Sequence, residues 1–123
     1  MHPLFIYSAE QHSGSGLANL LQRRKFTTIL FYDIESLLEK IRFDATGIII
    51  LDVPSLSNMN LVIQEIENIF HISEDIPIIL LTPYSHNEKE VEEFVAKGYC
   101  ILEKPVSIET LILKVQEVKE KMH

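Results

Sequence analysis

The sequence predicts a three-layer α/β fold, in which helices cover both faces of a mostly parallel sheet. Short apolar segments alternate with segments of helical periodicity along the 123 residues, and this strict alternation is typical of parallel sheets. Two of the apolar segments, 47–51 and 77–82, are continuous aliphatic runs, as expected for strands that are buried on both faces. The length suits one domain, and we expect residues 1–123 to form it.

The composition limits the classes of partner that this chain can bind. The net charge is −7, from 11 basic and 18 acidic residues, which argues against nucleic-acid binding because that attraction needs a positive surface. The basic cluster 23–25 is interpreted as a solvated face. No segment is long and apolar enough to cross a membrane, and the first residues do not resemble a signal peptide. The single cysteine, Cys100, suits a reducing compartment, so we expect a cytoplasmic location and no membrane partner.

The first half of the chain contains three predicted strands and two predicted helices. A strand at 3–8 is followed by a polar stretch, AEQHSGSG, which we interpret as a flexible loop. A helix comes next, with Leu17, Leu20 and Leu21 on one side. The strand at 27–32 is β-branched and aromatic, and Asp33 can cap the helix after it. That helix has apolar residues at i, i+3, i+4 and i+7, which are Ile34, Leu37, Leu38 and Ile41. The third strand covers 47–51.

The second half continues the same alternation. We expect a helix at 60–70, a strand at 77–82, a helix at 88–97 and a strand at 99–103. Ser107 can cap the last helix, whose buried stripe is Ile108, Leu111, Ile112, Val115 and Met122. Leu113 points away from that stripe and is a candidate contact for a partner. Cys100 is interpreted as a small buried hydrophobic residue.

Asp52, which directly follows the aliphatic run 47–51, needs an explanation because a carboxylate is costly to bury without a partner. In open parallel sheets, reactive groups gather at the carboxyl ends of the strands. The other strand ends carry Ser8, Ala9 and Glu10 after the first strand, Thr82 after the fourth, and Lys104 with Pro105 after the fifth. A carboxylate in such a cluster can attack phosphorus, and an ammonium and a hydroxyl can bind the phosphoryl oxygens. The pattern therefore indicates phosphoryl chemistry.

Over essentially its whole length the chain resembles a receiver domain of response regulators in two-component signalling. The matching segments are IIILD ending at Asp52, IILLT ending at Thr82, and EKP with Lys104 and Pro105, separated by 30 and 22 residues. The resemblance implies a flavodoxin-like, CheY-like sheet in the order 2-1-3-4-5. It also implies that Asp52 is the phosphoacceptor, that Thr82 is the switch hydroxyl, that Lys104 assists and that the Lys104–Pro105 bond is cis. Such a domain is no enzyme beyond promoting its own phosphoryl transfer and dephosphorylation.

The resemblance also implies a cofactor and partners. Mg²⁺ would be held by Asp52 and by the backbone carbonyl of Pro54, but Ser8 and Ala9 stand where the family has an acidic pair. Glu10, one place beyond that pair, is either a further ligand or a solvated loop acid. We therefore expect Mg²⁺ binding to be weakened. The implied partners are a histidine kinase or a phosphotransfer protein. A homodimer through the fourth helix, fifth strand and fifth helix is a further expectation.

Other departures from the family pattern leave alternatives open. Pro83 follows Thr82, Ile101 replaces an aromatic switch residue, and Leu56 and Asn60 replace a proline and a glycine. The chain could thus be a degenerate receiver that acts as an interaction module without phosphorylation, with Lys104 paired to Asp52 as a permanent salt bridge. A third alternative is a flavodoxin-like cofactor binder that uses the SGSG stretch, although its glycine pattern lacks the full dinucleotide fingerprint.

Overall fold

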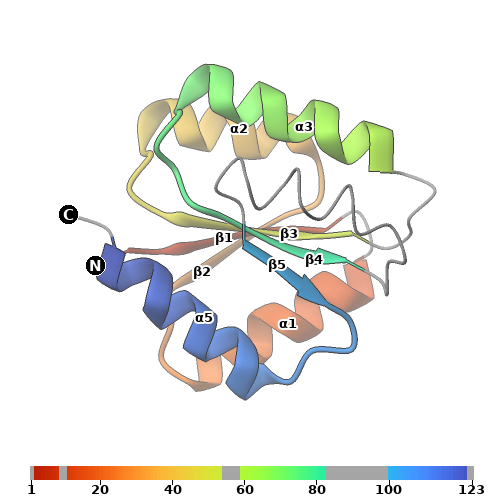
Figure 1. Ribbon diagram of the computed structural model, residues 1–123, viewed down its shortest axis with the longest axis vertical. Coiled ribbons are helices and arrows are strands. Elements are labelled where there is room, and N and C mark those ends of the chain that lie inside the picture. Colours follow the sequence, from red (N-terminus) through yellow and green to blue (C-terminus); the bar gives the residue numbers. More distant parts are fainter. Residues whose placement is uncertain (1, 9–10, 54–58, 83–99, 122–123) are drawn as a thin grey trace.

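In the computed structural model the chain forms a five-stranded sheet with helices on both faces (Figure 1). The structure describes residues 2–8, 11–53, 59–82 and 100–121, and for 11–13 and 59–63 it describes the backbone alone. The strands are β1 Leu4–Ser8, β2 Thr28–Phe31, β3 Ile48–Asp52, β4 Ile78–Thr82 and β5 Cys100–Glu103. The helices are α1 Gln11–Arg23, α2 Ile34–Phe43, α3 Met59–Ile72 and α5 Ile108–Lys121.

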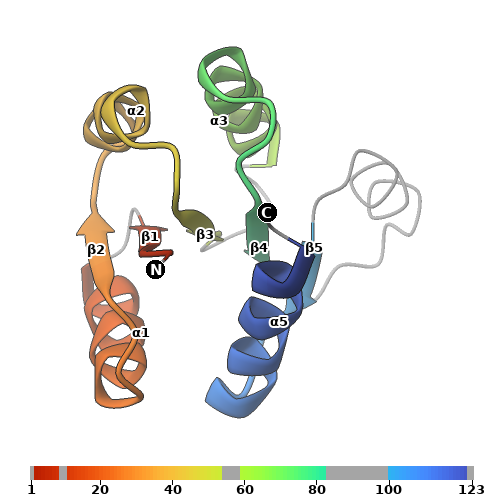
Figure 2. The ribbon, with the colours of Figure 1, turned by 90° about the vertical axis from the view of Figure 1, so that its left-hand side faces the viewer.

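The sheet is parallel and its strand order is β2-β1-β3-β4-β5, which confirms the prediction. Viewed along its edge, the sheet has α2 and α3 on one face and α1 and α5 on the other (Figure 2). The predicted helix at 88–97 lies outside the described residues. The predicted three-layer architecture is therefore confirmed by the arrangement of the described elements.

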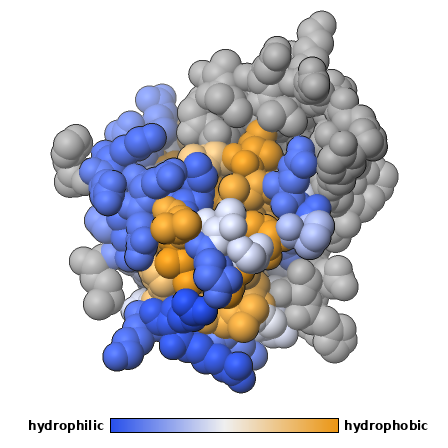
Figure 3. Space-filling model, turned by 60° about the horizontal axis from the view of Figure 1, so that its bottom comes forward, coloured by the Kyte–Doolittle hydropathy of each residue, from blue (hydrophilic) through white to orange (hydrophobic). Residues whose placement is uncertain are grey.

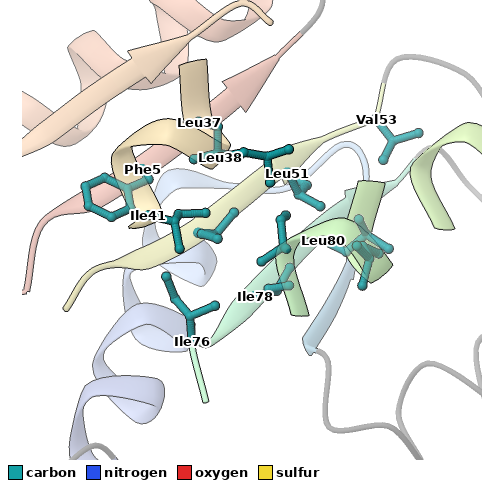
Figure 4. Close-up of a cluster of buried hydrophobic side chains, with 12 residues drawn as sticks. Phe5, Leu37, Leu38, Ile41, Leu51, Val53, Ile76, Ile78 and Leu80 are labelled. Atoms are coloured by element: carbon teal, nitrogen blue, oxygen red, sulfur yellow. The ribbon is translucent and has the colours of Figure 1, made fainter. Parts of the chain in front are cut away.

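Two hydrophobic clusters fill the spaces between the sheet and the helices. The cluster under α2 and α3 includes Phe5, Leu51 and Leu80 (Figure 4). The cluster on the other face includes Ile6 and Ile50 and is covered by α1 and α5. Every residue of β3 and β4 is buried, so the continuous aliphatic runs are explained by packing on both faces.

Contacts at the surface join α5 to the segment between α1 and β2. Arg24, which directly follows α1, forms an ion pair of 2.9 Å with Glu109 in the first turn of α5, and the Lys119 ammonium lies 4.9 Å from the centre of the Phe26 ring. Figure 3 shows this side of the molecule, where hydrophobic side chains are exposed between hydrophilic ones. The basic cluster 23–25 is exposed, as predicted for a solvated face.

The predicted helix caps are confirmed. The Asp33 carboxylate accepts a hydrogen bond of 2.9 Å from the Ser36 backbone N–H, and the Ser107 hydroxyl accepts one of 3.1 Å from the Thr110 backbone N–H. Such caps satisfy N–H groups that the first helical turn leaves without partners. Leu113 is 61% exposed, as expected for its position on α5.

Two expectations are wrong. The SGSG stretch is not a flexible loop, because it belongs to α1; serine and glycine weaken a helix locally, but packing overrides that preference. Cys100 is half-buried rather than buried, since it begins the edge strand β5. In the part of the chain that the structure describes, no helix is long and apolar enough to cross a membrane.

Candidate functional site

Asp52 is the last residue of β3, and its carboxylate lies at the carboxyl edge of the sheet. The strand sits between β1 and β4, with Asp52 in register with Ser8 on one side and with Leu81 on the other. Its side chain is only 2% exposed. A carboxylate so deeply buried requires compensating charges or hydrogen-bond donors.

Lys104 supplies the compensating charge. It follows β5, and its ammonium forms an ion pair with Oδ1 of Asp52. The same nitrogen donates a hydrogen bond of 2.9 Å to the backbone carbonyl of Val53, while the Lys104 backbone N–H donates one of 2.7 Å to the carbonyl of Thr82. The Lys104–Pro105 peptide bond is cis, as the resemblance implied. These contacts fix the lysine beside the acid although the two residues are distant in sequence.

Ser8 contacts the other carboxylate oxygen. Its hydroxyl lies 3.0 Å from Oδ2 of Asp52, to which it donates a hydrogen bond, and its side chain is fully buried. Sequence reasoning treated Ser8 only as a missing acid and did not identify this contact. The signal that could have found it is the pairing of the two strand ends, because neighbouring parallel strands that stop at the same level bring their last residues together.

Thr82 ends β4, the strand next to β3, and is buried. Its backbone holds Lys104, as described above, so the hydroxyl-bearing residue and the lysine are joined at one edge. Asp52, Thr82 and Lys104 thus lie on three successive strand ends, in the arrangement that the sequence predicted. Their roles in phosphoryl chemistry remain a prediction.

Most of the other positions that the sequence analysis singled out are not among the described residues. Ala9, Glu10, Pro54, Leu56 and Pro83 lie outside the described residues. Ile101 is half-buried on β5 and packs against the cluster beneath α2 and α3. It therefore serves the hydrophobic core at the position where the resemblance implies an aromatic switch residue in other receivers.

The described residues do not by themselves fit a Mg²⁺ ion. Mg²⁺ usually takes one or two carboxylates together with waters. Asp52 is the only buried carboxylate at the described strand ends, and its two oxygens contact Ser8 and Lys104; Glu103, which ends β5, is exposed. Within the described ranges, no group of three or more His, Cys, Asp or Glu side chains is arranged to hold a metal ion.

A second polar pair joins β1 to α3, on the face of the sheet that α2 and α3 cover. The Tyr7 hydroxyl donates a hydrogen bond of 3.3 Å to the carboxylate of Glu65. Burial, followed by the charge of Glu65, raises the pKa of Tyr7 to about 12. Burial also raises the pKa of Glu65, although the hydrogen bond from Tyr7 partly opposes this. The sequence analysis did not identify this pair, because the helical pattern of α3 does not reveal which strand residue lies beneath it.

Similar solved structures share this fold along nearly the whole chain. FixJ-N is 20% identical with a TM-score of 0.81, and the match covers 100% of this chain and 97% of that one. A two-component response regulator from Clostridium difficile is 18% identical with a TM-score of 0.79, covering 100% and 99%. The beryllofluoride-activated NtrC4 receiver domain dimer is 23% identical with a TM-score of 0.75, covering 98% of each chain.

Sequence comparison identifies the family. A search of curated proteins found no match. The sequence model of the response regulator receiver domain, however, matches residues 5–116, which is most of the chain. This match agrees with the strand order, with the cis Lys104–Pro105 bond and with the ion pair between the strand-end residues Lys104 and Asp52. The chain therefore belongs to the response regulator receiver domain family, the signalling modules of two-component systems.

Proposed function

We propose that this receiver domain takes part in a phosphorelay and accepts a phosphoryl group on Asp52. The donor would be the phosphohistidine of a histidine kinase or phosphotransfer protein, or a small phosphodonor. The observation that carries the proposal is the ion pair between Lys104 and the buried carboxylate of Asp52. The ammonium lies where it can bind the oxygens of an incoming phosphoryl group.

In the proposed step, a carboxylate oxygen of Asp52 forms a bond to phosphorus, giving an acyl phosphate. The bond between phosphorus and the donor atom breaks, and the donor keeps the electron pair as imidazole nitrogen or as acetate oxygen. Lys104 would move its contact from the carboxylate to the transferred oxygens. Thr82 would then approach the added charge. The surface formed by the predicted helix at 88–97, by β5 and by α5 would change in response.

The test is incubation with acetyl phosphate, with and without Mg²⁺, followed by intact mass spectrometry. The expected result is one phosphoryl adduct in the wild type that is absent in Asp52→Asn. Asp33→Asn is the matched control, because it removes an exposed carboxylate at the start of α2. The proposal is rejected if neither acetyl phosphate nor a competent cognate kinase produces an adduct.

A second candidate function is favoured by the contacts of Ser8. The Asp52 carboxylate already has a hydroxyl on one oxygen and an ammonium on the other, which is the pattern expected of a receiver that works without phosphorylation. This alternative is an interaction module whose Lys104–Asp52 ion pair is permanent. It predicts that a partner binds Asp52→Ala as tightly as the wild type, whereas phosphorelay signalling predicts that the phosphorylated protein and the variant differ in affinity.

Receiver domains interact with kinases and typically bind Mg²⁺. For this chain we propose a histidine kinase or phosphotransfer protein as partner, a single domain over 1–123 and a cytoplasmic location. The predicted Mg²⁺ ligands remain Asp52, the Pro54 carbonyl and Glu10, of which the structure describes only Asp52. A homodimer through the predicted helix at 88–97, β5 and α5 is also proposed, because one similar structure is a receiver domain dimer. Analytical ultracentrifugation before and after phosphorylation tests it.

A further inference from the structure

The two oxygens of the Asp52 carboxylate have different neighbours. Oδ1 pairs with the Lys104 ammonium, and Oδ2 accepts the hydrogen bond of 3.0 Å from the Ser8 hydroxyl. A charged acceptor makes such a hydrogen bond stronger than one between neutral groups. The acid is thus held from two sides by donors that belong to this chain.

The position of Ser8 is imposed by the fold. On one side, the pairing of β1 with β3 sets Ser8 level with Asp52. On the other side lies Gly14 of α1, where an added Cβ would come within 2.8 Å of the Ser8 Cβ and 3.4 Å of its Oγ. The helix therefore approaches Ser8 as closely as a glycine allows, and the serine side chain is confined between α1 and the edge of the sheet.

A divalent cation at Asp52 would compete with these contacts. It would bind an oxygen that Ser8 or Lys104 now contacts, and a neutral hydroxyl in place of a carboxylate offers it less electrostatic attraction. The hydrogen bond from Ser8 occupies a lone pair of Oδ2 that a cation could otherwise use. The same hydroxyl that orders the carboxylate thus opposes the metal.

We propose that Ser8 is a positioning residue that replaces a divalent cation at Asp52, so that the receiver site is ordered without metal and binds Mg²⁺ weakly. The proposal rests on the proposed function for its biological meaning, since it concerns the same carboxylate. It identifies residue 8 as the position that decides between a metal-free and a metal-dependent site. Its test does not require phosphoryl transfer.

The experiment is a titration with Mg²⁺, and separately with Mn²⁺, followed by the amide NMR signals of β1, β3 and the segment after β5. The wild type is expected to show the weakest binding. Ser8→Ala, which removes the hydroxyl from Oδ2, should bind at least about tenfold more tightly, because a hydrogen bond to a charged group contributes about 1.5–3 kcal/mol and about 1.4 kcal/mol corresponds to a tenfold change in affinity. Ser8→Asp, which adds a carboxylate, should bind more tightly still.

Ser36→Ala is the matched control. The Ser36 hydroxyl also lies 3.0 Å from an aspartate oxygen, Oδ2 of Asp33, but this pair is exposed at the start of α2. It should bind Mg²⁺ like the wild type. Equal Mg²⁺ affinity in the wild type and Ser8→Ala overturns the proposal, and so does a folded Ser8→Asp protein that gains no affinity.

Thermal unfolding with EDTA or with Mg²⁺ provides a second measurement if Ser8→Asp folds poorly. The wild-type midpoint should be the same in both solutions, whereas Ser8→Ala should be stabilised by Mg²⁺ because a ligand that binds the folded state raises its stability. A wild type that Mg²⁺ stabilises as much as it stabilises Ser8→Ala contradicts the proposal.

The acetyl phosphate assay keeps the two proposals separate. A missing adduct in every variant counts against phosphorelay function, while the metal titration still decides the role of Ser8.

Discussion

At the scale of single residues, the ion pair between Lys104 and Asp52 differs from the other described ion pairs in burial. The Asp52 side chain is 2% exposed and that of Lys104 is 28% exposed, whereas both partners of the Lys114–Glu117 pair are at least 31% exposed. Removal of one partner from a buried pair leaves an uncompensated charge, and this is costly. Exposed pairs contribute little because water screens them.

We therefore predict that Lys104→Met lowers the free energy of unfolding by about 3 kcal/mol, while the control Lys114→Met changes it by less than about 0.5 kcal/mol. Urea denaturation measures both. Combining Lys104→Met with Asp52→Asn should restore part of the loss, since the second change removes the stranded charge. Losses that simply add in the double variant would show that the two side chains do not interact.

Glu65 makes stability depend on pH. Because burial raises its pKa in the folded protein above the ordinary value of 4.5, the folded state keeps the proton at a pH where the unfolded state has lost it. The stabilising contribution of the protonated form is complete below the unfolded pKa and is lost as the pH rises through the folded pKa. The folded protein thus favours the protonated form of Glu65 over its carboxylate form.

The prediction is that Glu65→Gln is more stable than the wild type near neutral pH, and that this advantage disappears toward about pH 4. The glutamine can still accept the hydrogen bond from Tyr7. Urea denaturation between about pH 4 and pH 8 measures the difference. Glu67→Gln is the control, because it removes one charge from an exposed position on the same helix. A Glu65→Gln advantage that does not change with pH would contradict the explanation.

At the scale of elements, α1 contains two glycines with different surroundings. A Cβ at Gly14 would lie 2.8 Å from the Ser8 Cβ and 3.1 Å from the Leu30 Cδ1, whereas a Cβ at Gly16 would have nothing within 4 Å. Both glycines weaken the helix, because glycine loses more backbone entropy on folding than alanine. Only Gly14 is required by packing.

Gly16→Ala should therefore raise the free energy of unfolding by about 0.5–1 kcal/mol. Gly14→Ala should lower it, because α1 has to move away from β1 to accommodate the methyl group. Thermal or urea unfolding compares the two variants, and the amide NMR signals of Ser8 and Asp52 should shift in Gly14→Ala alone. An equal gain in stability from both substitutions would show that α1 does not approach Ser8 closely.

At the scale of the whole molecule, the centre of the sheet is protected by clusters on both faces. Residues of β3 and β4 are buried throughout, while residues of β2 and most of β5 are half-buried at the edges. Hydrophobic burial is the main stabilising contribution in a domain of this size. Stability should therefore decrease from the centre of the sheet outward.

Amide hydrogen exchange measures this gradient. The amides of β3 and β4 should exchange only on global unfolding, whereas those of β2 and β5 should exchange through smaller, local openings. Adding a low concentration of urea should accelerate exchange in the central strands more than at the edges, because global unfolding exposes more surface. Exchange in β3 that is as fast as in β5 would contradict the two-cluster description of the core.

The sequence alone determined the layer architecture, most element positions, the helix caps and the candidate trio Asp52, Thr82 and Lys104. These features follow from local signals: aliphatic runs, helical periodicity and polar residues at strand ends. The sequence does not reveal that the stretch 12–16 is helical, because the cost of its glycines is local, whereas the helix packs against Ser8 of β1 and Leu30 of β2.

Only the tertiary structure decided which groups surround Asp52. The hydrogen bond from Ser8 depends on the register of β1 against β3, and the Tyr7–Glu65 pair depends on how α3 lies across the sheet. Such contacts join residues more than 40 positions apart. No periodicity along the chain encodes them, because they arise from the distance and orientation between elements once the core has packed.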